Sequence, residues 1–222
     1  MGSLVRVQSK TLLNYNRYFK LYIKCILKNA TYFFVENHTQ QSLKNESILL
    51  GSKYLYFTCS HLKFSSVLYL SQLTDIFAYE VPRRTINKFT SGSVNKSTNL
   101  SSVGKSLASI IVYNFHLLGT QERFYIFVSN TLSTQSLKAV SSFSVKIVSI
   151  TELFFAANWL ERELSELHGV IIKNKKDLRN LMLQYGDSSS PFQKSFPSIG
   201  LKEMYYNPIK DTIVQSPLSV QF

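Results

Sequence analysis

Hydrophobic and polar residues alternate most clearly in the middle of the chain, over residues 110–118 and 123–130, which read IIVYNFHLL and RFYIFVSN. β-branched and aromatic residues dominate both runs, and the short link GTQE joins them. Two such runs separated by a short Gly-containing link are typical of a β-hairpin. The pattern therefore predicts two antiparallel strands at the centre of the fold.

Apolar spacing predicts further elements on both sides of this hairpin. Residues 48–59, ILLGSKYLYFTC, indicate a strand with a break or turn at Gly51, and residues 61–73 have apolar positions at roughly helical spacing. Residues 142–150, SFSVKIVSI, predict another strand. Residues 15–34 are irregularly amphipathic, which predicts a basic helix that leads into the body of the protein.

The most regular helical pattern lies just after residue 148, where apolar residues recur at three- and four-residue steps. Ser149 and Glu152 fit a capping box at its start, and Gly169 supplies the left-handed position that commonly ends a helix. We expect this helix to pack on a core along one apolar stripe. The stripe consists of Ile150, Leu153, Ala157, Leu160, Leu164 and Leu167.

Charged residues crowd the same helix. Glu161 and Glu163 flank the stripe on either side, and Arg162 lies opposite it, one turn from Glu166. Residues two positions apart on a helix point about 200° apart, so Glu161 and Glu163 do not converge on one substrate atom. We interpret these charges as a docking face, and the alternative is a solvated face with weak pairing.

Two stretches lack the apolar residues that a packed element needs. Residues 83–109 are rich in Ser, Thr, Asn and Lys, which predicts a long surface insertion. Four of the five prolines lie beyond Gly186. Prolines at that density exclude long helices and favour an extended tail laid over a surface.

The charge balance indicates that the protein binds an acidic partner. The 222 residues include 25 Lys and Arg against 13 Asp and Glu, a net charge of +12, which suits nucleic acid, anionic lipid or acidic protein subunits. No acid precedes Glu36, so the basic N-terminal residues fit a mitochondrial presequence or, as the favoured interpretation, a helical tail held on a partner. No run approaches the roughly 18 apolar residues of a membrane span.

The sequence offers little catalytic or metal-binding chemistry. Cys25, Cys59 and the four histidines are scattered, so they indicate neither a disulfide framework nor a zinc or iron–sulfur site. VGKS at residues 103–106 resembles the end of a P-loop, but Asn99 stands where the first glycine is required. We find no G-x-S-x-G pattern either. Lys and Arg are spread thinly, yet a basic RNA-binding or ribosomal protein stays open as an alternative.

Three blocks near the C-terminus resemble a known family. They read ANWLERELSELHG, KKDLRNLMLQYG and FQKSFPSIGLKEMYY, and in this order they resemble the C-terminal signature of the 30 kDa, NuoC-like subunit of respiratory complex I. Weaker similarity extends the resemblance to about residues 60–222. The sequence departs from the family pattern at Ser165, His168, Lys175, Asn180, Gln184 and Ser195, which indicates a divergent member.

The resemblance implies a fold and a division of the chain. The fold is an α+β two-layer domain with a mixed β-sheet and packing helices, followed by a C-terminal helix and a long extended tail. We accordingly expect a basic N-terminal extension over residues 1–35 and an α+β domain over residues 36–170, with the insertion at about 83–109. Residues 171–222 are expected to form an extended segment that wraps partner subunits.

The resemblance also implies a role. It is that of a core structural subunit in the peripheral arm of mitochondrial NADH:ubiquinone oxidoreductase, on the matrix side of the inner membrane, beside the 49 kDa quinone-site subunit. The chain is expected to have no active site and no cofactor of its own, with FMN and iron–sulfur clusters in its neighbours. Structural or intersubunit contacts are expected at Trp159, Glu161, Arg162, Glu163, Glu166, Asp177, Arg179, Lys194, Phe196 and Pro197.

Overall fold

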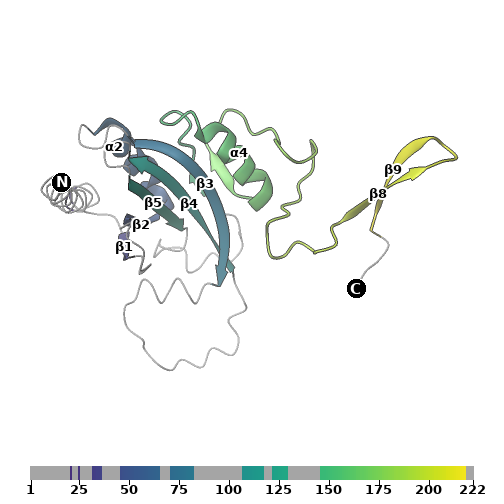
Figure 1. The fold of residues 1–222 in the computed structure, drawn as a ribbon, viewed down its shortest axis with the longest axis horizontal. Coiled ribbons are helices and arrows are strands. Elements are labelled where there is room, and N and C mark those ends of the chain that lie inside the picture. Colours follow the sequence, from purple (N-terminus) through teal and green to yellow (C-terminus); the bar gives the residue numbers. More distant parts are fainter. Residues whose placement is uncertain are drawn as a thin grey trace, which may run out of the picture.

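A five-stranded mixed sheet forms the centre of the fold (Figure 1). The computed structural model describes Leu21, Cys25 and residues 32–36, 46–65, 71–82, 107–117, 122–129 and 146–218. The strands lie in the order β1 (Tyr32–Glu36), β2 (Glu46–Gly51), β5 (Glu122–Ser129), β4 (Leu107–Leu117) and β3 (Ser71–Pro82). β2 and β5 are parallel, and the other neighbouring strands are antiparallel. The predicted central hairpin corresponds to β4 and β5 and is confirmed.

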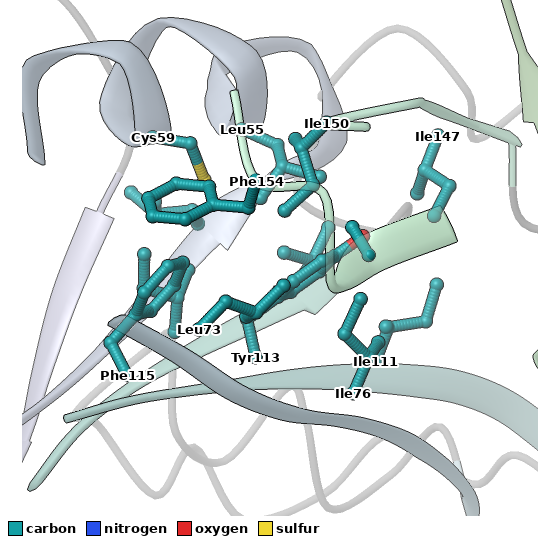
Figure 2. Close-up of a cluster of buried hydrophobic side chains, with 14 of the residues drawn as sticks. Leu55, Cys59, Leu73, Ile76, Ile111, Tyr113, Phe115, Ile147, Ile150 and Phe154 are labelled. Carbon is teal, nitrogen blue, oxygen red and sulfur yellow. The ribbon is translucent and has the colours of Figure 1, made fainter. Parts of the chain in front are cut away.

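Two helices, α2 (Leu55–Phe64) and α4 (Ala157–His168), pack on one face of this sheet. Together with the sheet they bury one large apolar cluster, and the predicted α+β class is confirmed. Figure 2 shows Leu55 and Cys59 of α2 on one side of this core and Tyr113 and Phe115 of β4 on the other, with Phe154 between Cys59 and Phe115. Phe154, from the turn before α4, meets Phe115 edge to face with ring centroids 5.3 Å apart.

Smaller elements complete the described part of the chain. A 3-10 helix, η1 (Ser52–Tyr54), leads into α2, and β6 (Lys146–Val148) pairs in parallel with β7 (Ile171–Lys173). Near the C-terminus, β8 (Lys202–Asn207) and β9 (Thr212–Pro217) form an antiparallel hairpin that lies away from the sheet in Figure 1. Within the described ranges, no helix is both long and apolar enough to cross a membrane.

The structure corrects the elements predicted before the central hairpin. The predicted break at Gly51 is confirmed, because β2 ends there. The strand expected beyond it, up to residue 59, is wrong, because η1 and α2 occupy that stretch. The helix expected over residues 61–73 is also wrong, because α2 ends at Phe64 and β3 begins at Ser71. The aromatic residues after Gly51 suggested a strand. Their burial instead follows the three- and four-residue spacing of a helix, at Leu55, Thr58, Cys59 and Leu62.

Two predicted boundaries also change. The N-terminal helix was expected to continue to residue 34, but residues 32–36 form β1 and pair with β2. The polar insertion was expected to end at residue 109, but β4 begins at Leu107. The remainder of that insertion, at 83–106, and most of the N-terminal extension lie outside the described residues.

Truncation of a core side chain should destabilise the fold far more than truncation of an exposed one. Ile126 of β5 is fully buried, whereas Ile213 of β9 is exposed. We expect Ile126→Ala to lower the free energy of unfolding by about 2–5 kcal/mol, through lost burial and the cavity that remains. Ile213→Ala should change it by less than about 0.5 kcal/mol. Urea denaturation of the full chain measures both, and equal effects would contradict the assigned core.

Candidate functional site

Helix α4 begins later than its sequence pattern predicts, because the chain between Ile150 and Ala157 forms turns. The Leu153 and Phe154 N–H groups both donate to the Ile150 carbonyl, and the helix itself starts at Ala157. Ser149 donates its hydroxyl to a carboxylate 12 positions along the chain instead of capping the helix. The predicted capping box of Ser149 and Glu152 is therefore wrong.

The apolar stripe and the glycine stop of α4 do appear in the structure. Gly169 has φ of 66° and donates its N–H to the Ser165 carbonyl, as in a left-handed helix end. Leu167 is half-buried, and the rest of the predicted stripe lies in the main core or packs against it. These are Ile150, Leu153, Ala157, Leu160 and Leu164.

Glu161 is fully buried at the centre of a polar cluster. The Ile150 N–H donates to its Oε1 at 2.8 Å, and the hydroxyls of Ser149 and Thr151 donate to its Oε2 at 2.7 and 3.1 Å. The Lys175 ammonium lies 3.0 Å from the same Oε2, and its side chain is 1% exposed. A buried charge is tolerated only when it is paired and hydrogen-bonded, and this carboxylate is both. The cluster ties α4 to the preceding turn and to the segment after β7.

Lys175 completes this cluster with a full set of acceptors. Its Nζ donates to the Asn158 carbonyl at 3.0 Å, to Thr151 Oγ1 at 3.3 Å and to Glu161 Oε2 at 3.0 Å. An ammonium has three donors, so each has an acceptor. Sequence reasoning missed this role, although Lys175 stands out as a departure from the family pattern.

Glu166, one turn further along α4, binds main chain and no cation within the described residues. Its carboxylate accepts the N–H groups of Leu181, Met182 and Leu183 at 2.8, 2.8 and 3.2 Å. These residues belong to a stretch without helix or strand, residues 174–187, which we call the clamped segment. Hydrogen bonds to a charged group are among the stronger ones, so Glu166 fixes the path of this segment.

Arg162, one turn before Glu166 on α4, binds the same segment. Its Nε donates to the Arg179 carbonyl at 2.8 Å and its Nη2 to the Asn180 carbonyl at 3.4 Å. Its Nη1 lies 3.7 Å from Asp177 Oδ2. Asp177 also accepts from the Arg179 guanidinium, with the closest contact at 2.9 Å. The structure thus brings together Arg162, Asp177 and Arg179, three of the residues selected from sequence.

These contacts hold the pKa of Asp177 well below its usual range. The hydrogen bonds from the Arg179 side chain and backbone are the main cause, and the charges of Arg179 and Arg162 add to it. Because the pKa in the folded chain lies below that of the unfolded chain, the contacts favour the folded state above a pH of about 4. Their contribution is lost as the pH falls further.

The C-terminal end of α4 receives the tail that follows the clamped segment. Phe192 donates its N–H to the Leu167 carbonyl, and the Gln193 amide donates to the His168 carbonyl, both at 3.0 Å. A Cβ at Gly169 would lie 2.6 Å from Gln193 Nε2, so the glycine permits this close approach. The tail then reaches β3, where the Lys194 N–H donates to Glu80 Oε2 at 2.9 Å.

The other residues selected from sequence make fewer contacts. Trp159 is exposed, with its ring centroid 5.8 Å from the Arg162 guanidinium carbon. Glu163 is half-buried and has no hydrogen bond or ion pair with any described residue. Phe196 is half-buried and donates its N–H to the Gln193 carbonyl, and Pro197 is exposed. The structure does not bring these residues into the Glu161 cluster.

Chemically, the arrangement around α4 is suited to holding a chain in place. Among the described residues, no group of three or more His, Cys, Asp or Glu could hold a metal ion. Burial, and secondly the charge of Glu161, raises the pKa of the Cys59 thiol and of the Tyr113 phenol. Both groups therefore stay protonated at neutral pH, and neither is an activated nucleophile.

Comparisons with known proteins agree with the sequence resemblance. The family model described as the 30 kDa subunit of the respiratory-chain NADH dehydrogenase matches residues 52–202. NADH-ubiquinone oxidoreductase subunit 9 of Paramecium primaurelia is 49% identical over 67 residues, 30% of this chain and 32% of that protein. The mitochondrial NADH dehydrogenase (ubiquinone) iron-sulfur protein 3 of Candida albicans is 28% identical over 214 residues, 94% of this chain and 65% of that protein. The chain thus spans less than two thirds of the length of either relative.

A solved structure shares the fold. A chain of the membrane-bound sulfane sulfur reductase, an archaeal respiratory membrane complex, superposes with a TM-score of 0.51 at 10% identity. The match covers 82% of this chain and 87% of that one. At this identity the likeness concerns the fold alone.

Removal of the Glu166 charge should loosen the clamped segment. In Glu166→Gln, one acceptor oxygen becomes an N–H₂ group that faces backbone donors. Either the Met182 amide or the amides of Leu181 and Leu183 then lose their acceptor, and the remaining hydrogen bonds lose the carboxylate charge. We expect these amides to exchange with deuterium at least about tenfold faster, measured by mass spectrometry. Glu163→Gln is the matched control and should leave the exchange unchanged. Equal exchange in both variants would contradict the clamp.

Loss of the cation beside Glu161 should be costly, and removal of both charges less so. Lys175→Met leaves a fully buried carboxylate without its counter-ion, and we expect the free energy of unfolding to fall by about 3–5 kcal/mol. Addition of Glu161→Gln should recover part of this loss, because no unpaired charge then stays buried. Urea denaturation of the two single variants and the double variant gives the coupling energy, and strictly additive effects would contradict the buried pair.

Proposed function

Because this chain belongs to the family of the 30 kDa subunit of the respiratory-chain NADH dehydrogenase, we propose that it is a core structural subunit of mitochondrial respiratory complex I. It would lie in the peripheral arm, on the matrix side of the inner membrane. There it would support electron transfer from NADH to ubiquinone by scaffolding the quinone-binding module. The mitochondrial designation of the Candida relative supports this location.

The observation that carries this proposal is the way α4 holds the clamped segment. Charged side chains of the helix bind the backbone of the segment, which leaves several of its side chains free to face outwards. Several of these are large and apolar: Leu178, Met182, which is 68% exposed, and Tyr185, which is 76% exposed. Exposed apolar residues on a fixed backbone are characteristic of a protein interface. A scaffold needs such a surface, whereas an enzyme active site does not.

We propose the 49 kDa quinone-site subunit and its iron–sulfur neighbours as the partners of this surface. A net charge of +12 favours neighbours that present acidic surfaces. In this proposal the chain has no active site, and FMN and the iron–sulfur clusters belong to other subunits. Trp159, exposed on α4, and Arg179, exposed within the clamped segment, would contribute to the same contact.

A charge placed on the clamped segment should block assembly at an apolar position and be tolerated at a polar one. We expect Met182→Asp to reduce co-migration of the tagged chain with NADH dehydrogenase activity on native gels at least about tenfold, because the interface would bury an unpaired carboxylate. Gln184→Asp adds the same charge two residues away, at an exposed polar position, and should assemble normally. Thermal unfolding of both variants checks that each still folds.

Two results would contradict the proposed function. One is migration of the unmodified chain with ribosomes and without NADH dehydrogenase activity, which would favour an RNA-associated role. The other is full NADH-to-ubiquinone activity in mitochondria that lack the chain, since a core subunit is required for assembly.

A further inference from the structure

Helix α2 is apolar on both of its faces, although only one face is buried in the core that the described residues form. The inward face lies in the main core, where Figure 2 shows Leu55 and Cys59. On the outward face Tyr56 is 36% exposed, Phe57 47% and Phe64 77%. A surface helix normally has charged or polar residues in these positions, and a helix that is apolar all round is normally buried. The sequence of α2 is therefore that of a helix with something packed on each side.

The outward face is also basic. Lys53 of η1 and Lys63 of α2 are exposed. Lys53 lies three and four positions before Tyr56 and Phe57, and Lys63 lies seven positions after Tyr56, so helical spacing puts both lysines on the side of the aromatic residues. No acid occurs between Ser52 and Phe64. Neither lysine forms an ion pair with a residue that the structure describes, and Lys63 Nζ lies 5.2 Å from the Phe154 ring centroid. We call Lys53, Tyr56, Phe57, Lys63 and Phe64 together the α2 outer face.

We propose that the α2 outer face is a second docking surface, which binds an acidic amphipathic helix of another protein. The aromatic rings would contact the apolar stripe of that helix, and Asp or Glu beside the stripe would pair with Lys53 and Lys63. This surface lies on a different element from the clamped segment. The proposal therefore goes beyond the proposed function and does not depend on it.

The charge on the α2 outer face favours a protein over a membrane surface. Recognition of anionic lipid normally uses clusters of about four to eight basic residues, and this face has two. Glu152 also reaches the face, where the Tyr56 hydroxyl lies 3.5 Å from its Oε2. Two lysines and a few aromatic rings are enough for ion pairs with one acidic helix, and are fewer basic residues than an anionic bilayer normally requires.

Site-specific photo-crosslinking of the tagged full chain in its native cells tests this proposal. A photoreactive phenylalanine analogue at position 64, and separately at position 57, should form an adduct with the same peptide of one protein. Mass spectrometry of the adduct should find Asp or Glu at helical spacing in that peptide. Lys53→Glu combined with Lys63→Glu should lower the adduct yield about fivefold, the effect expected for two exposed ion pairs. Exchange of the acidic residues of the peptide for Lys should restore the yield.

A charge-matched control uses lysines elsewhere on the surface. Lys146 and Lys173 are exposed on β6 and β7, and Lys146→Glu combined with Lys173→Glu should leave the yield unchanged. Both double variants alter exposed side chains, so their thermal unfolding should match that of the unmodified chain. Equal loss of adduct in both would overturn the proposal, because the effect would then reflect net charge alone.

Other outcomes would also overturn it. Adducts with phospholipid would assign the face to a membrane, and adducts with a peptide that lacks acids would remove the charge complementarity. Absence of any adduct from positions 57 and 64, while a probe at Tyr185 reacts, would show that the face is uncovered. If the chain fails to migrate with NADH dehydrogenase but Phe64 still captures an acidic helix, the proposed function is wrong and this docking surface stands.

Discussion

Backbone polar groups need partners, and the clamped segment has no helix or strand of its own to supply them. Helix α4 provides these partners through Glu166, which accepts three N–H groups, and Arg162, which donates to two carbonyls. The position of α4 depends in turn on its apolar stripe and on the buried pair of Glu161 and Lys175. The path of the chain after β7 therefore follows from charges on a single helix.

The two helices on the sheet differ in how they use the side that faces away from the core. In α4 that side is charged, and much of the charge is satisfied within the chain by the clamped segment. In α2 it is aromatic and basic, and Tyr56, Phe57 and Phe64 stay 36%, 47% and 77% exposed, although the His61 ring contacts Phe57. The same sheet thus supports one helix that organises its own chain and one that is left to contact another.

Local patterns were readable from the sequence, and long-range contacts were not. The β4–β5 hairpin and the glycine stop at Gly169 depend on neighbouring residues, so alternation and residue type were sufficient to predict them. The aromatic run in α2 resembled a strand because propensity is weaker than the packing that determined its burial. The Glu161 cluster includes a contact between residues 24 positions apart, and Glu166 binds backbone N–H groups, which leave no trace in a sequence.

The contacts made by Glu166 have a consequence for how this protein can diverge. Every residue other than proline has the same backbone N–H group, so the Glu166 carboxylate can accept hydrogen bonds from positions 181–183 whatever their side chains are. Substitutions that alter the outward side chains of the segment leave its course unchanged. The outward side chains of the segment can therefore change one at a time as the surface of a neighbouring protein changes, while helix α4 keeps its contacts to the backbone.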